Sequence, residues 1–331
     1  MNTARLVLPE LLPTLNQFPA TDLTPETLPD LRNALENRAA QAFQKAEDFQ
    51  VTVEQRHIPA TPEGNRTIRL LTVQPKETSS TPRPVLLHFH GGGHCAGRPA
   101  QNTAELCRFA QDLNCLVISP DYRLTPETPF PGGIEDAYAT LCWIHDNADA
   151  LNIRRDQIAV TGESAGGNLA AAICLLARDR NGPAILFQNL IYPMLDDRTI
   201  DNEANPSPVA GEFVWTRASN TYAWGILLAP SLPGADDISP YAAPSRASDL
   251  SGLPPVIMTI GSLDLFLEED LLYAQRLIRS GVSVELEIVP GAFHAFDVTE
   301  TPVAKRTLDR RITSMTRFFT PPRDRPGMHY P

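Results

Sequence analysis

The sequence predicts an α/β fold with a mostly parallel central sheet, flanked by helices and carrying a helical cap. Three observations lead to this prediction. From residue 84 onward, continuous apolar runs of strand length alternate with helical patterns, as in a parallel sheet covered on both faces. A Gly-x-Ser-x-Gly turn joins one of these strands to a long apolar helix. Residues 195–240 interrupt the alternation with polar, proline and large aromatic residues.

Composition narrows the function classes. The chain has 331 residues, enough for a large core, and its net charge of -11 argues against a nucleic-acid or anionic-membrane partner. Its apolar runs are all too short to span a membrane, and Pro9, Glu10 and Pro13 break the only N-terminal run, which argues against a signal peptide. Five cysteines without C-x-x-C spacing favour reduced core thiols and a cytoplasmic location over disulfides or a metal site. A homodimer is left open.

The first 50 residues are helical in pattern and do not alternate with strands. Four leucines recur at helical spacing, and a second segment from about residue 29 to 49 is rich in Ala, Gln and Glu. These leucines are Leu8, Leu11, Leu12 and Leu15. We expect residues 1–50 to form an N-terminal cap segment that packs on a cap insertion at residues 195–240. The main domain would then comprise residues 51–194 and 241–331.

Strands and helices follow in order along the main domain. Residues 51–57 and 67–73 alternate in polarity around Pro62-Glu63-Gly64-Asn65, which predicts a hairpin. The buried strands that follow are expected at residues 85–89, 115–119, 157–161, 184–191, 256–260 and 284–289. Helices are expected at about residues 106–113, 134–144, 168–177 and 267–280. A last helix should begin after Thr301 as N-cap, with Pro302 in its first turn.

The turn at Gly162-Glu163-Ser164-Ala165-Gly166 has the context of a nucleophile elbow, because a strand precedes it and a helix follows it. Residues two positions on either side of the serine would crowd the backbone, and glycine relieves that crowding. Ser164 would be exposed at the top of the sheet, at a helix N-terminus that favours negative charge. Taken alone, the same motif is also compatible with an ordinary turn.

A nucleophilic serine needs a base and an orienting acid, which in this kind of fold come later in the chain, each after a strand. Asp264 follows the strand at 256–260, and His294 follows the strand at 284–289. The alternatives are an Asp264 that only caps the next helix and a His294 without chemistry. Poorer candidates for the acid fall inside the helix: Glu268, Glu269 and Asp270.

Consecutive glycines in His90-Gly91-Gly92-Gly93 would let backbone N–H groups face a substrate carbonyl. Gly92 and Gly93, with the N–H of Ala165, would form an oxyanion hole. A flexible loop is the plain alternative. A phosphate loop would require Lys-Ser or Lys-Thr before its helix, which Gly97-Arg98-Pro99 does not provide.

From about residue 50 to 320 the sequence resembles the bacterial hormone-sensitive lipase family of esterases, within the α/β-hydrolase superfamily. The matching stretches are His90-Gly91-Gly92-Gly93, Asp121-Tyr122-Arg123-Leu124-Thr125-Pro126-Glu127, the serine elbow, Tyr192-Pro193-Met194-Leu195-Asp196-Asp197-Arg198, Gly261-Ser262-Leu263-Asp264 and Pro290-Gly291-Ala292-Phe293-His294-Ala295-Phe296. The resemblance implies an α/β-hydrolase fold and a carboxylic ester hydrolase with no cofactor. It maps the triad onto Ser164, Asp264 and His294, and the oxyanion donors onto Gly92, Gly93 and Ala165. Many members have Asp or Thr where this chain has Glu163, which we interpret as a structural hydrogen-bonding residue.

These residues predict a serine carboxylesterase acting on small-molecule esters with short acyl chains, through an acyl-enzyme. Cap aromatic residues would limit the acyl pocket, and we name Phe213 and Trp215 as pocket candidates. An amide or lactone hydrolase with the same triad is an alternative. A third alternative is a receptor, since some relatives bind a ligand without hydrolysing it. Loss of the triad histidine would favour a receptor, but His294 is present in this chain.

Overall fold

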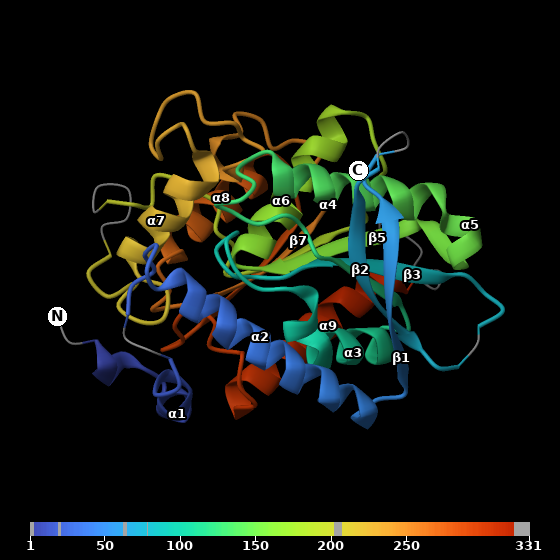
Figure 1. Cartoon of the computed structure of the whole chain (residues 1–331), viewed down its shortest axis with the longest axis horizontal. Coiled ribbons are helices and arrows are strands. Elements are labelled where there is room, and N and C mark those ends of the chain that lie inside the picture. The colour runs from blue at the N-terminus through green and yellow to red at the C-terminus, as the bar shows by residue number, and fades with distance from the viewer. Residues whose placement is uncertain (1–2, 19–20, 62–64, 78, 202–206, 321–331) are drawn as a thin grey trace.

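The computed structural model describes residues 3–18, 21–61, 65–77, 79–201 and 207–320. At its centre lies an eight-stranded sheet in the order β1-β2-β4-β3-β5-β6-β7-β8 (Figure 1). β2 pairs antiparallel with β1 and β4, and all the other neighbours are parallel. The strands span Val51–Pro59 (β1), Thr67–Pro75 (β2), Arg83–Phe89 (β3), Leu116–Pro120 (β4), Ile153–Glu163 (β5), Gln188–Ile191 (β6), Val256–Gly261 (β7) and Val284–Val289 (β8).

The predicted hairpin is present as β1 and β2, although turn residues 62–64 lie outside the described residues. β6 is shorter than the predicted strand at 184–191. The residues before it already bond to β5, because Leu186 N–H reaches Ile158 C=O and Phe187 C=O accepts from Val160 N–H. Leu186 and Phe187 therefore already bond to the neighbouring strand, although the regular strand begins only at Gln188.

Helices cover both faces of the sheet. Core side chains of α4, α6 and α8 pack on one face, and those of α3 and α9 pack on the other, as the two layers in Figure 1 show. The last helix has the predicted Thr301 N-cap, whose side chain accepts a hydrogen bond from Ala304 N–H. The helices span Thr103–Asp112 (α3), Gly132–Asp146 (α4), Ala148–Leu151 (α5), Ala165–Asp179 (α6), Leu267–Arg279 (α8) and Pro302–Phe319 (α9), with short 3₁₀ turns at Pro99–Asn102 and Pro244–Arg246.

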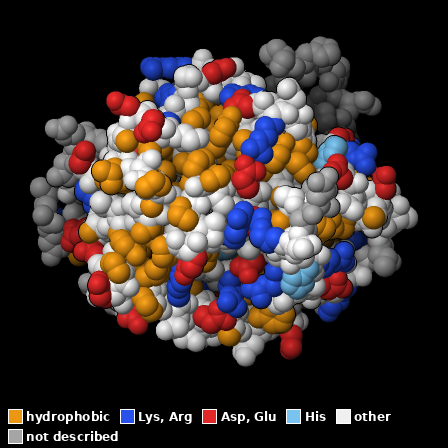
Figure 2. Space-filling view, turned by 45° about the horizontal axis from the view of Figure 1, so that its top comes forward, with side chains coloured by type: hydrophobic (Ala, Val, Ile, Leu, Met, Phe, Trp, Pro, Cys, Tyr) orange, Lys and Arg blue, Asp and Glu red, His pale blue; other side chains and the backbone are white. Residues whose placement is uncertain are grey.

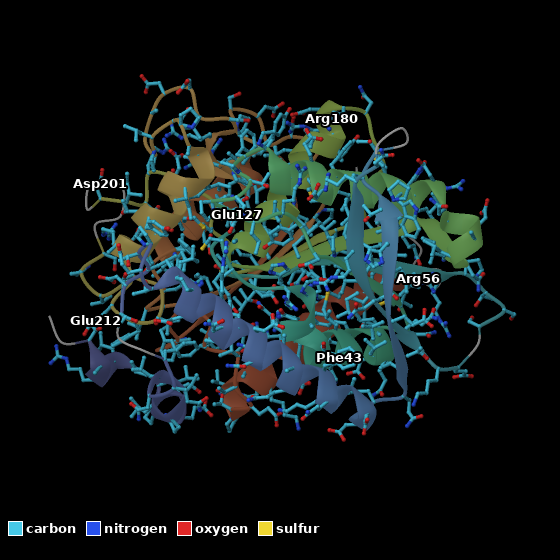
Figure 3. The ribbon with its side chains drawn as sticks, in the orientation of Figure 1. Phe43, Arg56, Glu127, Arg180, Asp201 and Glu212 are labelled. Atoms are coloured by element: carbon cyan, nitrogen blue, oxygen red, sulfur yellow. The ribbon has the colours of Figure 1, made fainter. Side chains whose placement is uncertain are left out.

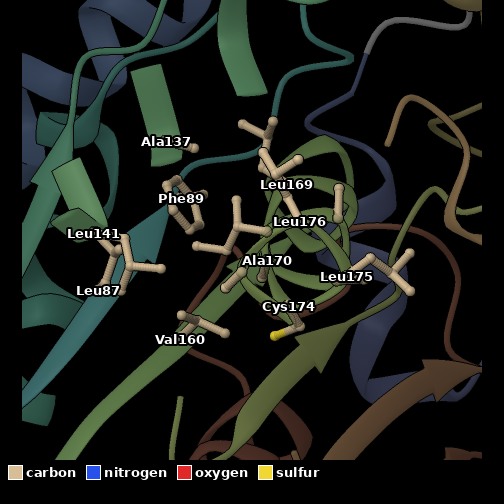
Figure 4. Close-up of a cluster of buried hydrophobic side chains, with 14 of the residues drawn as sticks. Leu87, Phe89, Ala137, Leu141, Val160, Leu169, Ala170, Cys174, Leu175 and Leu176 are labelled. Atoms are coloured by element: carbon tan, nitrogen blue, oxygen red, sulfur yellow. The ribbon is translucent and has the colours of Figure 1, made fainter. Parts of the chain in front are cut away.

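α6 is buried against the sheet along most of its length. Figure 4 shows Leu87 and Val160 on neighbouring strands facing Leu169, Ala170 and Cys174 of this helix. All five side chains are at most 2% exposed. Truncating a buried leucine of this kind costs about 2–5 kcal/mol. The helix that begins directly after Ser164 is therefore held firmly on the sheet.

The N-terminal segment differs from the predicted leucine-faced helix. Pro9 and Pro13 each lie in the first turn of a short element, so the chain forms 3₁₀ turns and a one-turn helix, and Leu12 is 41% exposed. The predicted second helix is present as α2. The elements are 3₁₀ turns at Ala4–Leu6 and Pro9–Leu11, α1 at Leu12–Leu15, α2 at Leu28–Gln44 and a 3₁₀ turn at Lys45–Asp48.

This segment packs on the insertion at 195–240, whose one helix in the described residues is α7, Arg217–Leu228. Leu23 N–H donates to Ser219 Oγ at 2.8 Å, and Thr3 N–H donates to Glu212 at 3.0 Å. Figure 3 shows Glu212 close to the first residues of the chain. Val7, Leu11 and Leu23 share one apolar cluster with Trp215 and Trp224. The two segments therefore form one layer over the site described below.

Acidic and basic side chains alternate with apolar ones over the face seen in Figure 2. Within the described ranges, no helix combines the length and the apolar character needed to cross a bilayer. All five cysteines have free thiols.

Candidate active site

Ser164 lies between the end of β5 and the start of α6, in a backbone conformation that serine rarely adopts. Its φ is 55° and its ψ is -119°. A Cβ added at Gly162 would lie 2.3 Å from Gly166 O, and one at Gly166 would lie 1.9 Å from Phe89 O. Gly162 is therefore required by the closeness of the turn itself, and Gly166 by the close approach of the end of β3.

A continuous hydrogen-bonded chain runs from Ser164 to Asp264. Ser164 Oγ lies 2.9 Å from His294 Nε2, and His294 Nδ1 lies 2.8 Å from Asp264 Oδ2. A carboxylate can only accept, so Nδ1 carries the proton and leaves Nε2 free to accept from Ser164. Asp264 is fully buried, and the serine and histidine are about 5% exposed. The structure thus brings together the three side chains named from the sequence.

Asp264 has a second contact through its other oxygen. Its Oδ1 accepts from Phe266 N–H at 3.0 Å, while α8 has Phe266 as its N-cap. The carboxylate consequently stabilises the turn before the helix and orients His294 at the same time. The alternative role offered by the sequence, Asp264 as the cap of this helix, is not what the structure shows, because Phe266 is the N-cap and α8 has no side-chain cap hydrogen bond.

The glycine loop lies against the elbow. A Cβ built on Gly91 would be 3.5 Å from Ser164 Cβ. Gly92 and Gly93 have φ values of 126° and 61°, which favour glycine. Within the described part of the chain, their N–H groups have no hydrogen-bond partner. Ala165 opens α6, so its N–H has no acceptor within that helix. These donors are available to a ligand at Ser164.

His90 supports this loop from behind and is not part of the triad. Its ring stacks on Tyr122 with a centroid separation of 4.2 Å, and Tyr122 Oη donates to His90 C=O at 2.6 Å. Its Nδ1 donates to Gly91 C=O at 2.9 Å. Burial lowers the pKa of His90 to about 4, so the ring stays neutral at neutral pH.

Glu163, which precedes Ser164, is hydrogen-bonded to buried side chains. These contacts agree with its interpretation as a structural residue. His88 Nε2 lies 3.1 Å from Glu163 Oε1, and Asn102 Nδ2 donates to the same oxygen. Burial alone would raise the pKa of Glu163, but the His88 contact lowers it below its usual value. The carboxylate fixes the end of β5 against β3 and the loop before α3.

Trp215, in the insertion at residues 195–240, lies against the glycine loop and near His294. A Cβ added at Gly93 would lie 2.4 Å from the edge of the indole, and the indole lies 6.1 Å from the His294 ring. Its Nε1 donates to Asn220 Oδ1 at 3.1 Å. The other predicted pocket residue, Phe213, packs on Phe293 at 6.1 Å. Trp215 therefore lies beside the glycine loop and His294, whereas Phe213 contacts the loop that carries His294.

The N-terminal helix α2 is joined to the back of the glycine loop by one arginine. Arg32 Nε donates to Cys95 C=O and Nη2 to Thr125 C=O, both at 2.8 Å. The guanidinium also holds Glu127 in a bidentate pair at 2.7 and 2.8 Å. Glu127, labelled in Figure 3, thus fixes a loop, as expected, rather than facing Ser164. A cavity of about 410 Å³ adjoins this arginine and contains none of the triad residues.

Two further carboxyl groups are buried close to Asp264. Glu269 Oε1 accepts from the backbone of Leu195 and Asp196, while the Asp270 oxygens have no hydrogen-bond partner among the described residues. Burial raises the pKa of Asp270 well above its usual value, and the nearby Glu269 and Asp264 raise it further. Within the described ranges, no group of three His, Cys, Asp or Glu side chains is placed to hold a metal ion.

Sequence reasoning did not identify three residues that surround the His294 loop. Tyr192 and Phe266 contact the His294 ring at 4.7 and 5.2 Å, and Asp297 accepts from Tyr192 Oη. Tyr192 follows a predicted strand and opens one of the stretches that resemble the family, whereas the only sequence signal of the other two is that they lie within three residues of Asp264 or His294.

Comparison with known proteins places the chain among esterases. Residues 86–298 match a sequence family described by the alpha/beta hydrolase fold. Carboxylesterase NlhH of Mycobacterium tuberculosis is 34% identical over 241 residues, which cover 71% of this chain and 73% of the relative. The chain belongs to the hormone-sensitive lipase family of α/β hydrolases. The family resemblance and the fold class predicted from the sequence are therefore confirmed.

Two further proteins extend this comparison. Ethyl acetate hydrolase of Pseudomonas putida is 31% identical over 223 residues, which cover 67% of this chain and 69% of the relative. The solved structure of a bacterial heroin esterase matches with a TM-score of 0.86 at 36% identity, covering 97% of this chain and 100% of that one. The likeness thus includes residues 195–240 and the N-terminal segment as well as the sheet.

Proposed function

We propose that this chain, a carboxylic ester hydrolase, cleaves short-chain acyl esters through an acyl-enzyme formed on Ser164. The observation that carries the proposal is the unbroken chain from Ser164 Oγ through His294 to Asp264, with links of 2.9 and 2.8 Å. Nucleophile, base and orienting acid are all in hydrogen-bond reach, as this chemistry requires.

In the proposed reaction, Ser164 Oγ attacks the ester carbonyl while its proton passes to His294 Nε2. The new carbon–oxygen bond places negative charge on the carbonyl oxygen, where the N–H groups of Gly92, Gly93 and Ala165 would stabilise it. Collapse breaks the bond to the alcohol, which leaves with the proton from His294. Water then repeats the sequence on the acyl-enzyme and releases the acid. Asp264 keeps the ring in the required tautomer.

The proposed preference for short acyl groups rests on the cap. Trp215 lies against Gly93 and is 8% exposed, so the space beside the oxyanion loop is restricted. We propose that residues 1–50 and 195–240 act together as this cap over a catalytic domain formed by residues 51–194 and 241–331. A relative named ethyl acetate hydrolase, whose substrate has a two-carbon acyl group, supports the same size range.

A p-nitrophenyl ester series from acetate to decanoate tests this proposal. We expect kcat/KM to be highest for acetate or butyrate and to fall for longer chains. A triglyceride emulsion with long acyl chains serves as the contrasting substrate. Faster turnover of that emulsion than of soluble butyrate esters contradicts the short-chain proposal. A p-nitroanilide or a lactone hydrolysed faster than every ester would favour amide or lactone hydrolysis instead.

We also propose a cytoplasmic location. The free thiols of the chain support a reducing setting of this kind.

A further inference from the structure

Tyr192 connects the loop of the nucleophile to the loop of the base. It directly follows β6, whose last residue, Ile191, accepts a hydrogen bond from Ser164 N–H at 2.9 Å. Its side chain reaches the loop that carries His294, where Oη donates to Asp297 Oδ1 at 2.6 Å. Asp297 lies three residues after His294 on the same loop. Tyr192 is therefore linked to Ser164 through its backbone neighbour Ile191 and to the His294 loop through its side chain.

The Tyr192 ring also touches the imidazole directly. The two ring centroids are 4.7 Å apart with an interplanar angle of 62°, an edge-on arrangement. Tyr192 is 2% exposed, so its ring has little freedom to move. Burial raises the pKa of Tyr192 well above its usual value, and the Asp297 carboxylate raises it further. The phenol keeps its proton and remains a donor to Asp297 across the pH range of an esterase assay.

The backbone of Tyr192 is strained in a way that its contacts must maintain. Its φ is 36°, a region that a bulky residue rarely enters. Its N–H donates to Thr259 C=O at 2.7 Å, and its side chain is held by Asp297. Strain of this kind persists only where the surroundings determine the conformation, and it concentrates at functional sites.

Asp297 is held in turn by a buried arginine on α9. Arg311 is 2% exposed, its Nη2 lies 3.2 Å from Asp297 Oδ2, and its Nη1 lies 3.0 Å from Glu105 Oε1. A buried carboxylate requires such a partner, because an unpaired buried charge is strongly unfavourable. The planar guanidinium fixes the direction of Asp297 between α3 and α9. The acceptor for Tyr192 is thus anchored in the core.

We propose that Tyr192, anchored by Asp297 and Arg311, is a positioning residue that keeps the His294 ring aligned with Ser164 during the reaction. The inference rests on the proposed role of His294 as base. Loss of alignment by about 1 Å reduces turnover by about 10²-fold in well-ordered sites. Because Tyr192 acts on the base and the nucleophile, its effect belongs to kcat rather than to KM.

The test compares two tyrosine-to-phenylalanine variants that each remove one hydrogen bond to an aspartate. Tyr192→Phe removes the bond to Asp297, and Tyr241→Phe removes the bond from Tyr241 Oη to Asp179 Oδ2, which is 2.9 Å long and remote from the triad. We expect Tyr192→Phe to lower kcat for p-nitrophenyl acetate by about 10-fold or more, within the range set by misalignment, with KM nearly unchanged. Tyr241→Phe should match the wild type in both constants. Equal kinetics of the two variants overturns the inference.

A double-mutant cycle with Asp297→Asn separates positioning from general loosening of the fold. If Tyr192 acts through Asp297, the double variant should be no slower than the slower single variant. If the losses in kcat of the two single variants multiply in the double variant, Tyr192 does not act through Asp297.

The low-field proton resonance of the His294–Asp264 hydrogen bond gives a second readout. It should shift in Tyr192→Phe and stay in place in Tyr241→Phe. If Ser164→Ala and His294→Ala retain turnover, the proposed function fails; if they abolish it while Tyr192→Phe is unaffected, only the positioning role fails.

Discussion

Replacing Asp264 by asparagine tests the assignment of the orienting acid and separates it from the hydrogen bond that holds the turn before α8. The two carboxylate oxygens accept from His294 Nδ1 at 2.8 Å and from Phe266 N–H at 3.0 Å. An amide has one oxygen and one NH₂ group, so either orientation sets one donor against another. When the NH₂ group faces the ring, His294 adopts the wrong tautomer and Nε2 can no longer take the serine proton. We expect kcat to fall by about 10⁴-fold, which corresponds to about 5.4 kcal/mol of transition-state stabilisation.

The effect on stability should be much smaller. One buried donor left without an acceptor costs about 1–3 kcal/mol, so the variant should fold and melt at a moderately lower temperature. Kinetics with p-nitrophenyl acetate, calorimetry and a Glu268→Gln control in the same helix turn distinguish the two quantities. The control should behave as wild type. An Asp264→Asn enzyme within 10-fold of the wild-type kcat, or a loss of activity that merely follows the unfolded fraction, refutes the assignment.

Three other predictions follow from the cap and the buried carboxyl. Trp215→Ala should move the preferred ester to longer chains, with each accommodated methylene raising kcat/KM about 4-fold; an unchanged chain-length profile contradicts the roof. Asp270→Asn should become more stable relative to the wild type as pH rises above about 4, because the raised pKa of Asp270 means that the wild-type fold loses stability once the unfolded chain ionises this carboxyl. Melting temperatures of both proteins between pH 4 and 8 measure this effect, and a constant difference between them refutes it. Deleting residues 1–25 should raise KM and alter chain-length preference before the sheet unfolds; wild-type kinetics from acetate to decanoate would exclude the segment from the site.

The sheet and the triad could be predicted from the sequence because both depend on local patterns. Buried parallel strands appear as continuous apolar runs, and their order places Ser164, Asp264 and His294 after the ends of β5, β7 and β8. The elbow glycines are set by close backbone approach, which the motif itself encodes. Strand ends were less well defined, as the late start of β6 illustrates.

The layer above the site was less predictable, for physical reasons. Leucine spacing alone predicts a helix around Leu12, but Pro9 and Pro13 divide the segment into a 3₁₀ turn and a single helical turn. Phe213 and Trp215 are both aromatic residues of the same segment, so the sequence gives no reason to distinguish them. The fold places Trp215 against Gly93 and Phe213 against Phe293. Tyr192 and Arg311 meet around Asp297 from segments more than 100 residues apart, a contact that no local pattern encodes.

The central claim is that Ser164 is the nucleophile, and covalent labelling tests it most directly. An organophosphonate that transfers its phosphorus to an activated serine should label the enzyme once per chain, and peptide mass spectrometry should locate the adduct on Ser164. Ser164→Ala should fold as wild type, take up no label and lose turnover by about 10³-fold or more. Stoichiometric labelling at another residue, or comparable hydrolysis of p-nitrophenyl acetate by folded Ser164→Ala, contradicts the account.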